Sequence, residues 1–72
     1  MKSEIQKVVD KAVKEDWFNE MTTSDLQSVC EAAAMEILRK NQVNFVAGRD
    51  AVKVMNISDK ILNGIYKQAE TN

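Results

Sequence analysis

The chain has 72 residues, of which 44 % are hydrophobic and 29 % charged, and its formal net charge is −1. This composition is typical of a globular protein, so we expect residues 1–72 to form one domain and exclude a disordered or fibrous chain. No apolar run approaches the about 20 residues that a transmembrane helix needs. Acidic and basic side chains are interleaved, which gives no polybasic tail.

The cysteine count and the chain length indicate the cellular location and the oligomeric state to expect. A single cysteine, Cys30, excludes an intrachain disulfide and favours a reducing compartment. The polar residues after Met1 do not resemble a signal peptide, so the expected location is the cytoplasm. A chain of this length buries only about 60 % of its unfolded surface on folding. Association with a second copy or a partner would add stability, and we expect a homo-oligomer.

A first amphipathic helix is predicted over residues 3–19. Ser3 followed by Gln6 has the spacing of a capping box at its start. Six apolar residues recur at helical spacing along it. They are Ile5, Val8, Val9, Ala12, Val13 and Trp17.

A second helix is predicted over residues 24–40. Short oxygen-bearing side chains precede it, and Asp25 suits the positive end of the helix dipole. Arg39 and Lys40 suit the negative end. The predicted buried stripe consists of Leu26, Val29, Cys30, Ala33, Ile37 and Leu38. Ala32 and Met35 lie off this stripe, and we predict that they form a helix-to-helix dimer contact.

Two interpretations compete after the predicted turn at residues 41–44. One is a single helix over about 43–69. The other is a pair of helices over 45–55 and 58–69, in which Asn56 ends the first and Ser58 caps the second. The pair is slightly favoured, and no segment has strand-like alternation. The predicted fold class is therefore all-α, a compact bundle of three to four helices.

The sequence offers little chemistry for catalysis. The absence of histidine excludes the Ser-His and Cys-His nucleophile pairs and most zinc sites. Two glycines are too few for a Gly-rich phosphate loop or a dinucleotide fingerprint. Cys30 lies on an apolar stripe and is expected to be a small buried hydrophobe. We therefore predict a non-enzyme without catalytic residues, metal or cofactor.

A helix-turn-helix DNA-binding regulator is the alternative function, built on residues 51–67. Five apolar residues fall on the positions that hold two such helices together. They are Ala51, Met55, Ile57, Leu62 and Ile65. The second helix would present Lys60, Asn63 and Lys67 to DNA, since asparagine suits adenine and lysine suits phosphate or guanine. Asp59 and the net negative charge argue against this function.

Protein binding is the favoured function, because several apolar residues fall off the predicted core arcs. Exposed aromatic residues on a small domain are typical interaction anchors. The predicted anchors are Trp17, Phe18, Phe45 and Val52. The competing interpretation tucks Phe18 and Phe45 beneath loops. We expect a small helical adaptor or inhibitor that modulates another protein, similar in type to the accessory proteins of phages and mobile elements.

Overall fold

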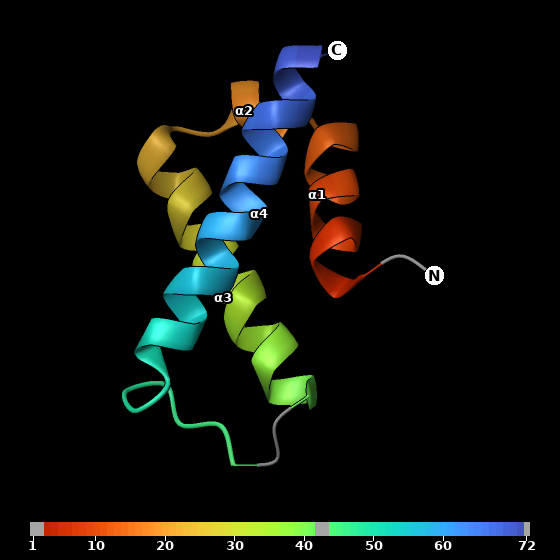
Figure 1. Cartoon of the computed structure of the whole chain (residues 1–72). Helices are drawn as coiled ribbons and strands as arrows, with labels where there is room; N and C mark the ends of the chain where they lie inside the picture. The colour runs from red at the N-terminus through yellow and green to blue at the C-terminus, as the bar shows by residue number, and fades with distance from the viewer. Residues whose placement is uncertain (1–2, 42–43, 72) are drawn as a thin grey trace.

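The computed structural model describes residues 3–41 and 44–71 (Figure 1). The described residues form four helices, α1 (Glu4–Lys14), α2 (Trp17–Glu20), α3 (Thr23–Asn41) and α4 (Ala51–Thr71), and contain no strand. The predicted all-α bundle of three to four helices is confirmed. No helix in these described ranges has the length and apolar character needed to cross a membrane.

The longest helix, α4, is the common packing partner of the others. It packs extensively against α1 and α3, whereas α1 and α3 contact each other much less. Figure 1 shows α4 crossing α3 and running beside α1, and it places α2 near the C-terminal end of α4. Both buried clusters contain α4 residues. The first holds Val9, Ala12, Trp17, Leu26, Cys30, Ile61 and Ile65, and the second holds Ala34, Leu38 and Val54.

A side-chain hydrogen bond caps the N-terminus of α1, and another caps the N-terminus of α3. Ser3 Oγ accepts a hydrogen bond from the Gln6 amide at 3.0 Å, which confirms half of the predicted capping box. The Gln6 side chain instead donates to Asp10 Oδ1 at 2.9 Å. At the start of α3, Thr22 Oγ1 accepts from the Asp25 amide at 3.1 Å. The polar residues that predicted both helix starts therefore act as caps.

The first predicted helix is wrong at its C-terminal end. It was expected to reach residue 19, but α1 ends at Lys14 and a separate turn of helix, α2, follows. The break occurs at Asp16, whose φ of 57° and ψ of 42° lie in the left-handed region that aspartate tolerates better than most residues. The turn redirects the chain so that Trp17 enters the core, where it is only 9 % exposed.

The favoured break in the last predicted helix pair is also wrong. Asn44 and residues 47–50 form turns, and α4 then runs without interruption through residues 56–58. Ser58 lies on the inner face of α4 and is 3 % exposed. A helix end there would place unpaired backbone amide and carbonyl groups inside the core, which is costly. Val43, assigned to this segment, lies outside the described residues.

The buried stripe of α3 is shifted from the predicted one. Leu26, Cys30, Ala34 and Leu38, at every fourth residue, are buried. The predicted stripe contained Ala33 instead of Ala34, and Ala33 is half-buried at its edge. Cys30 is fully buried, as expected, and burial, followed by the charge of Glu31, raises the pKa of its thiol.

Gly64 marks a close approach of α4 to α1, and a double substitution tests it. A Cβ atom at Gly64 would lie 2.9 Å from Val9 Cγ2, and Val9 is 2 % exposed. We expect Gly64→Ala to lower the free energy of unfolding by about 1 kcal/mol, because a β-branched neighbour cannot move aside. In a Val9→Ala background it should raise that free energy by about 1 kcal/mol, since alanine favours helix. Urea denaturation measures both changes. If Gly64→Ala changes the free energy of unfolding in the same direction in both backgrounds, the close contact between position 64 and Val9 is contradicted.

Asp50 closes the turn before α4 and makes stability depend on pH. Its carboxylate, 6 % exposed, accepts from the Val46 amide at 3.0 Å and lies 3.3 Å from Arg49 Nη2 and 3.9 Å from Lys53 Nζ. The Val46 hydrogen bond is the main cause that holds the pKa of Asp50 below its usual value. Desolvation opposes that shift, and Arg49 and Lys53 lower the pKa further.

Because this folded-state pKa is lowered, the ionised carboxylate stabilises the fold above the unfolded pKa of about 3.9. That contribution is lost as the pH falls through the folded pKa. We expect Asp50→Asn to lower the melting temperature at pH 7 and to differ less from the parent protein at pH 2. Thermal unfolding at the two pH values measures this, with Asp59→Asn, at an exposed carboxylate on α4, as control. A difference in melting temperature between Asp50→Asn and the parent protein that is as large at pH 2 as at pH 7 would contradict the role of the Asp50 charge.

Candidate binding site at one end of the bundle

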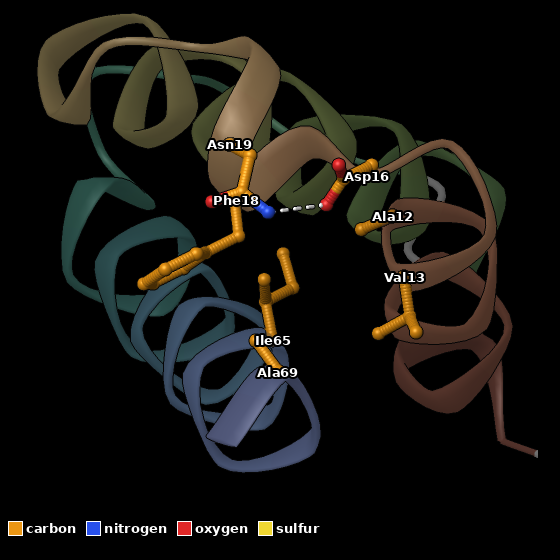
Figure 2. Close-up of a pocket in the computed structure, with 7 residues that line it drawn as sticks. All are labelled: Ala12, Val13, Asp16, Phe18, Asn19, Ile65 and Ala69. Carbon is orange, nitrogen blue, oxygen red and sulfur yellow. Dashed lines mark hydrogen bonds between the residues drawn. The ribbon is translucent and has the colours of Figure 1, made fainter. Parts of the chain in front are cut away.

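A pocket of about 320 Å³ opens where the end of α1, α2 and the last turns of α4 meet (Figure 2). Its lining residues are Ala12, Val13, Asp16, Phe18, Asn19, Ile65 and Ala69. Five of these seven side chains are apolar. Figure 2 shows Ile65 and Ala69 of α4 between Phe18 on one side and Val13 on the other, with Asp16 and Asn19 together at one edge. The pocket therefore has an apolar floor and a polar rim.

The rim is held by a local hydrogen-bond pair. Asn19 Nδ2 donates to Asp16 Oδ1 at 2.9 Å. The Asp16 carbonyl accepts from the amides of Asn19 and Glu20, so its main chain starts α2, but its side chain does not cap that helix. Among the described residues, Asp16 Oδ2 has no hydrogen-bond or ion-pair partner. The carboxylate therefore keeps one oxygen available at the edge of the pocket.

Phe18 forms an aromatic wall of the pocket. Its ring meets Tyr66 edge to face, with centroids 5.4 Å apart and an interplanar angle of 89°. This arrangement is a favoured one for two aromatic rings and fixes their relative orientation. Despite the contact, Phe18 is 43 % exposed. The wall is thus an oriented aromatic side chain with much of its surface in water.

Carboxylates outnumber cations on the segments around the pocket by four to three, with Glu15, Asp16, Glu20 and Glu70 against Lys11, Lys14 and Lys67. Residues 15–20 carry three carboxylates and no cation. Figure 1 shows that α1 and α4 both end near α2, and the C-terminal end of a helix carries partial negative charge. The last turn of α1 contains Lys11 and Lys14, whereas the last turn of α4 has no basic residue. No cluster of potential metal ligands occurs within residues 3–41 and 44–71.

The four predicted anchors occupy different environments. Phe18 and Val52 are exposed, Val52 by 70 %. Trp17 belongs to the core, because its ring fills the first cluster while its Nε1 donates to Glu15 Oε1 at 3.2 Å. Phe45 is half-buried against the second cluster, and the Arg39 guanidinium carbon lies 5.9 Å from its ring centroid. Phe18 is the anchor that also lines the pocket.

The structure also locates the remaining predicted site residues. Ala32 is exposed on α3, and Met35 is half-buried against the second cluster. Lys60, Asn63 and Lys67 are exposed on α4. Because α4 is continuous, the turn that a helix-turn-helix motif requires is absent there.

Sequence reasoning missed most of the pocket. Val13 was assigned to the apolar stripe of the first predicted helix and Ile65 to the apolar positions of the helix-turn-helix motif. The pocket-facing edges of Val13, Ile65 and Ala69 depend on where three helices end. The spacing of Asp16 and Asn19, three residues apart, was the available signal for the rim. Sequence reasoning also left Met55 and Val46 out of the predicted site, although they are 59 % and 51 % exposed, like Val52 near the start of α4.

No family model, curated protein or solved structure matches this chain. The pocket and the exposed residues are therefore the features of the molecule that indicate a function.

The left-handed turn at the rim gives a test of stability. A non-glycine residue in this conformation costs about 1 kcal/mol or more. We therefore expect Asp16→Gly to raise the free energy of unfolding by about 0.5 kcal/mol, even though the exposed contact with Asn19 is lost. The matched variant Asp16→Ala, which loses the same contact and keeps a Cβ atom, should lower it by about 1 kcal/mol. Denaturation with urea ranks the two, and Asp16→Ala as the more stable variant would contradict the left-handed geometry.

Proposed function

We propose that this protein acts without catalysis, by binding another protein at the end of the bundle that carries the Phe18 pocket. In this proposal it modulates the partner as an adaptor or inhibitor. The observation that carries the proposal is a half-exposed aromatic ring, oriented by Tyr66, at the mouth of an apolar-floored pocket. Aromatic anchors beside pockets contribute much of the binding energy of protein interfaces.

The exposed surface of the chain supports the same proposal. Its accessible area is 5119 Å², whereas a folded monomer of this mass exposes about 4,500 Å². The difference of about 600 Å² approaches the about 800 Å² that each partner buries in a standard interface. A partner on any face would bring the exposed area towards the usual value, so the surplus supports partner binding and the pocket geometry alone supports its location.

The cellular setting and self-association are part of the proposal. A cytoplasmic location fits a single buried cysteine, which needs no oxidising compartment. Self-association through α3 would use the exposed Ala32 together with Met35. This second contact lies away from the residues that line the pocket, so partner binding and dimer formation would be separable by substitution. Light scattering of the purified protein measures the oligomeric state.

The experiment is capture of partners from a lysate of the encoding organism on the immobilised full chain, after nuclease treatment, followed by mass spectrometry. We expect a discrete protein partner whose retention falls at least about tenfold with Phe18→Ala, as for a central anchor residue. Val52→Ala is the matched control, because Val52, also a predicted anchor, is exposed near the other end of α4 and does not line the pocket. It should retain the partner.

Circular dichroism shows whether each variant stays folded. Loss of helicity in Phe18→Ala would assign the ring to the core and contradict the proposal. Loss of the partner with Val52→Ala alone would move the interface to the start of α4. Retention that disappears with nuclease would indicate nucleic-acid binding in place of protein binding.

A further inference from the structure

The size of the pocket limits what it can hold. Ligand sites in proteins span about 300–1,000 Å³, so a pocket of about 320 Å³ lies at the lower limit. It is too small for a large cofactor and suits one long side chain of a protein partner. Its floor of Val13, Ile65 and Ala69 is apolar, so the part of the ligand that enters should be a hydrocarbon chain.

The rim selects for a hydrogen-bond donor. Asn19 commits its amide group to Asp16 Oδ1, which leaves Asp16 Oδ2 without a partner among the described residues. A purely apolar ligand would remove water from this carboxylate without replacing the hydrogen bonds, which is costly. A ligand that ends in a donor group would satisfy the carboxylate instead.

The surrounding charge selects for a cation. Three carboxylates lie within residues 15–20, and two helix C-termini converge on this end of the bundle. The last turn of α4 contains Glu70 and no basic residue to offset the helix dipole. Lys14 is the cation next in sequence to this segment, and no ion pair joins it to Asp16 in the described structure. The Asp16 carboxylate at the rim and the helix C-termini therefore favour a cationic ligand over an anionic one.

From this charge complementarity we propose that the pocket binds a lysine or arginine side chain of the protein partner. The aliphatic stem lies along the floor formed by Val13, Ile65 and Ala69, and the charged group meets the Asp16 carboxylate at the rim. Long basic side chains cover apolar surface with their stems while their heads stay at the edge of the contact. The arginine fork is favoured, since it can bind a carboxylate oxygen with directed N–H groups. This inference rests on the proposed function, because it names the chemistry of the partner at the same site.

The test uses a small probe, so that it does not depend on knowing the partner. The ¹⁵N-labelled full chain is titrated with n-butylguanidinium, which has an aliphatic stem and a cationic fork. Its matched neutral probe is n-butylurea, which has nearly the same shape. We expect the amide signals of residues 12–19 and 65–69 to shift with n-butylguanidinium. Its affinity should exceed that of n-butylurea about fivefold, which corresponds to an ion pair of about 1 kcal/mol.

Substitution at the rim completes the test. Asp16→Asn keeps the size of the side chain and tolerates the left-handed backbone, but removes the charge. It should reduce the preference for n-butylguanidinium to nearly none, while Glu36→Asn, at an exposed carboxylate on α3, should leave it unchanged. Circular dichroism of both variants checks that the fold is intact.

Three results would overturn the inference. They are equal binding of the charged and neutral probes, a preference that survives Asp16→Asn, and shifts spread over all exposed carboxylates. None of these depends on the partner experiment. If the probe binds as expected and no protein partner is captured, the proposed function fails and the cation pocket stands. If a Phe18-dependent partner is captured and the probe does not bind, only the inference about the lysine or arginine side chain fails.

Discussion

The packing of α1 against α4 at Gly64 is the contact on which the rest of the arrangement depends. A glycine here lets Val9 approach the α4 backbone, and the next residue, Ile65, is almost fully buried in the same cluster. The residue at this position therefore sets the separation of the two helices. Their separation in turn decides whether Val13 and Ile65 can line one pocket. A larger side chain would move α1 outwards and open both the core and the pocket.

A mismatch in helix length explains where the protein exposes apolar surface. α1 has 11 residues and α4 has 21, so at about 1.5 Å per residue α1 can cover only about half of its neighbour. The contacts of Val9 with Gly64, and the pocket shared by Val13 and Ala69, place α1 along the C-terminal half of α4. The N-terminal half begins beyond the reach of α1, and there Val52 and Met55 are exposed. The exposure of Val52 and Met55 thus follows from the shortness of α1.

The sequence predicted well what depends on a single helix and poorly what depends on how helices end. The period of apolar residues gives the fold class and the buried position of Cys30, and the spacing of Ser3 and Gln6 gives the cap at the start of α1. It does not give the left-handed turn at Asp16, because aspartate also fits a helix and nothing local forces it out. The turn forms because it lets Trp17 reach a cluster built by other helices.

The uninterrupted α4 was the less favoured of the two sequence interpretations for a related reason. Asn56 and Ser58 have the residue types of a helix end and a helix cap, and local preference alone slightly favours a break there. In the folded protein Ser58 lies on the buried face, with Ile57 packed against both clusters. The cost of unpaired backbone groups at that depth outweighs the local preference. The pocket could not be predicted from the sequence either, since it joins the ends of α1, α2 and α4. No sequence pattern within any one of these helices indicates it.

The short helix α2 shows how a small chain can fix a binding wall with few residues. Trp17 and Phe18 are neighbours on a helix, so their side chains project about 100° apart. Burial of Trp17 in the core therefore determines where Phe18 points, and Tyr66 then holds its ring. The Asn19 hydrogen bond holds the Asp16 carboxylate at the rim of the same pocket. Because these groups are oriented before a partner arrives, little conformational entropy is lost on binding, and a modest contact area can support a specific interaction.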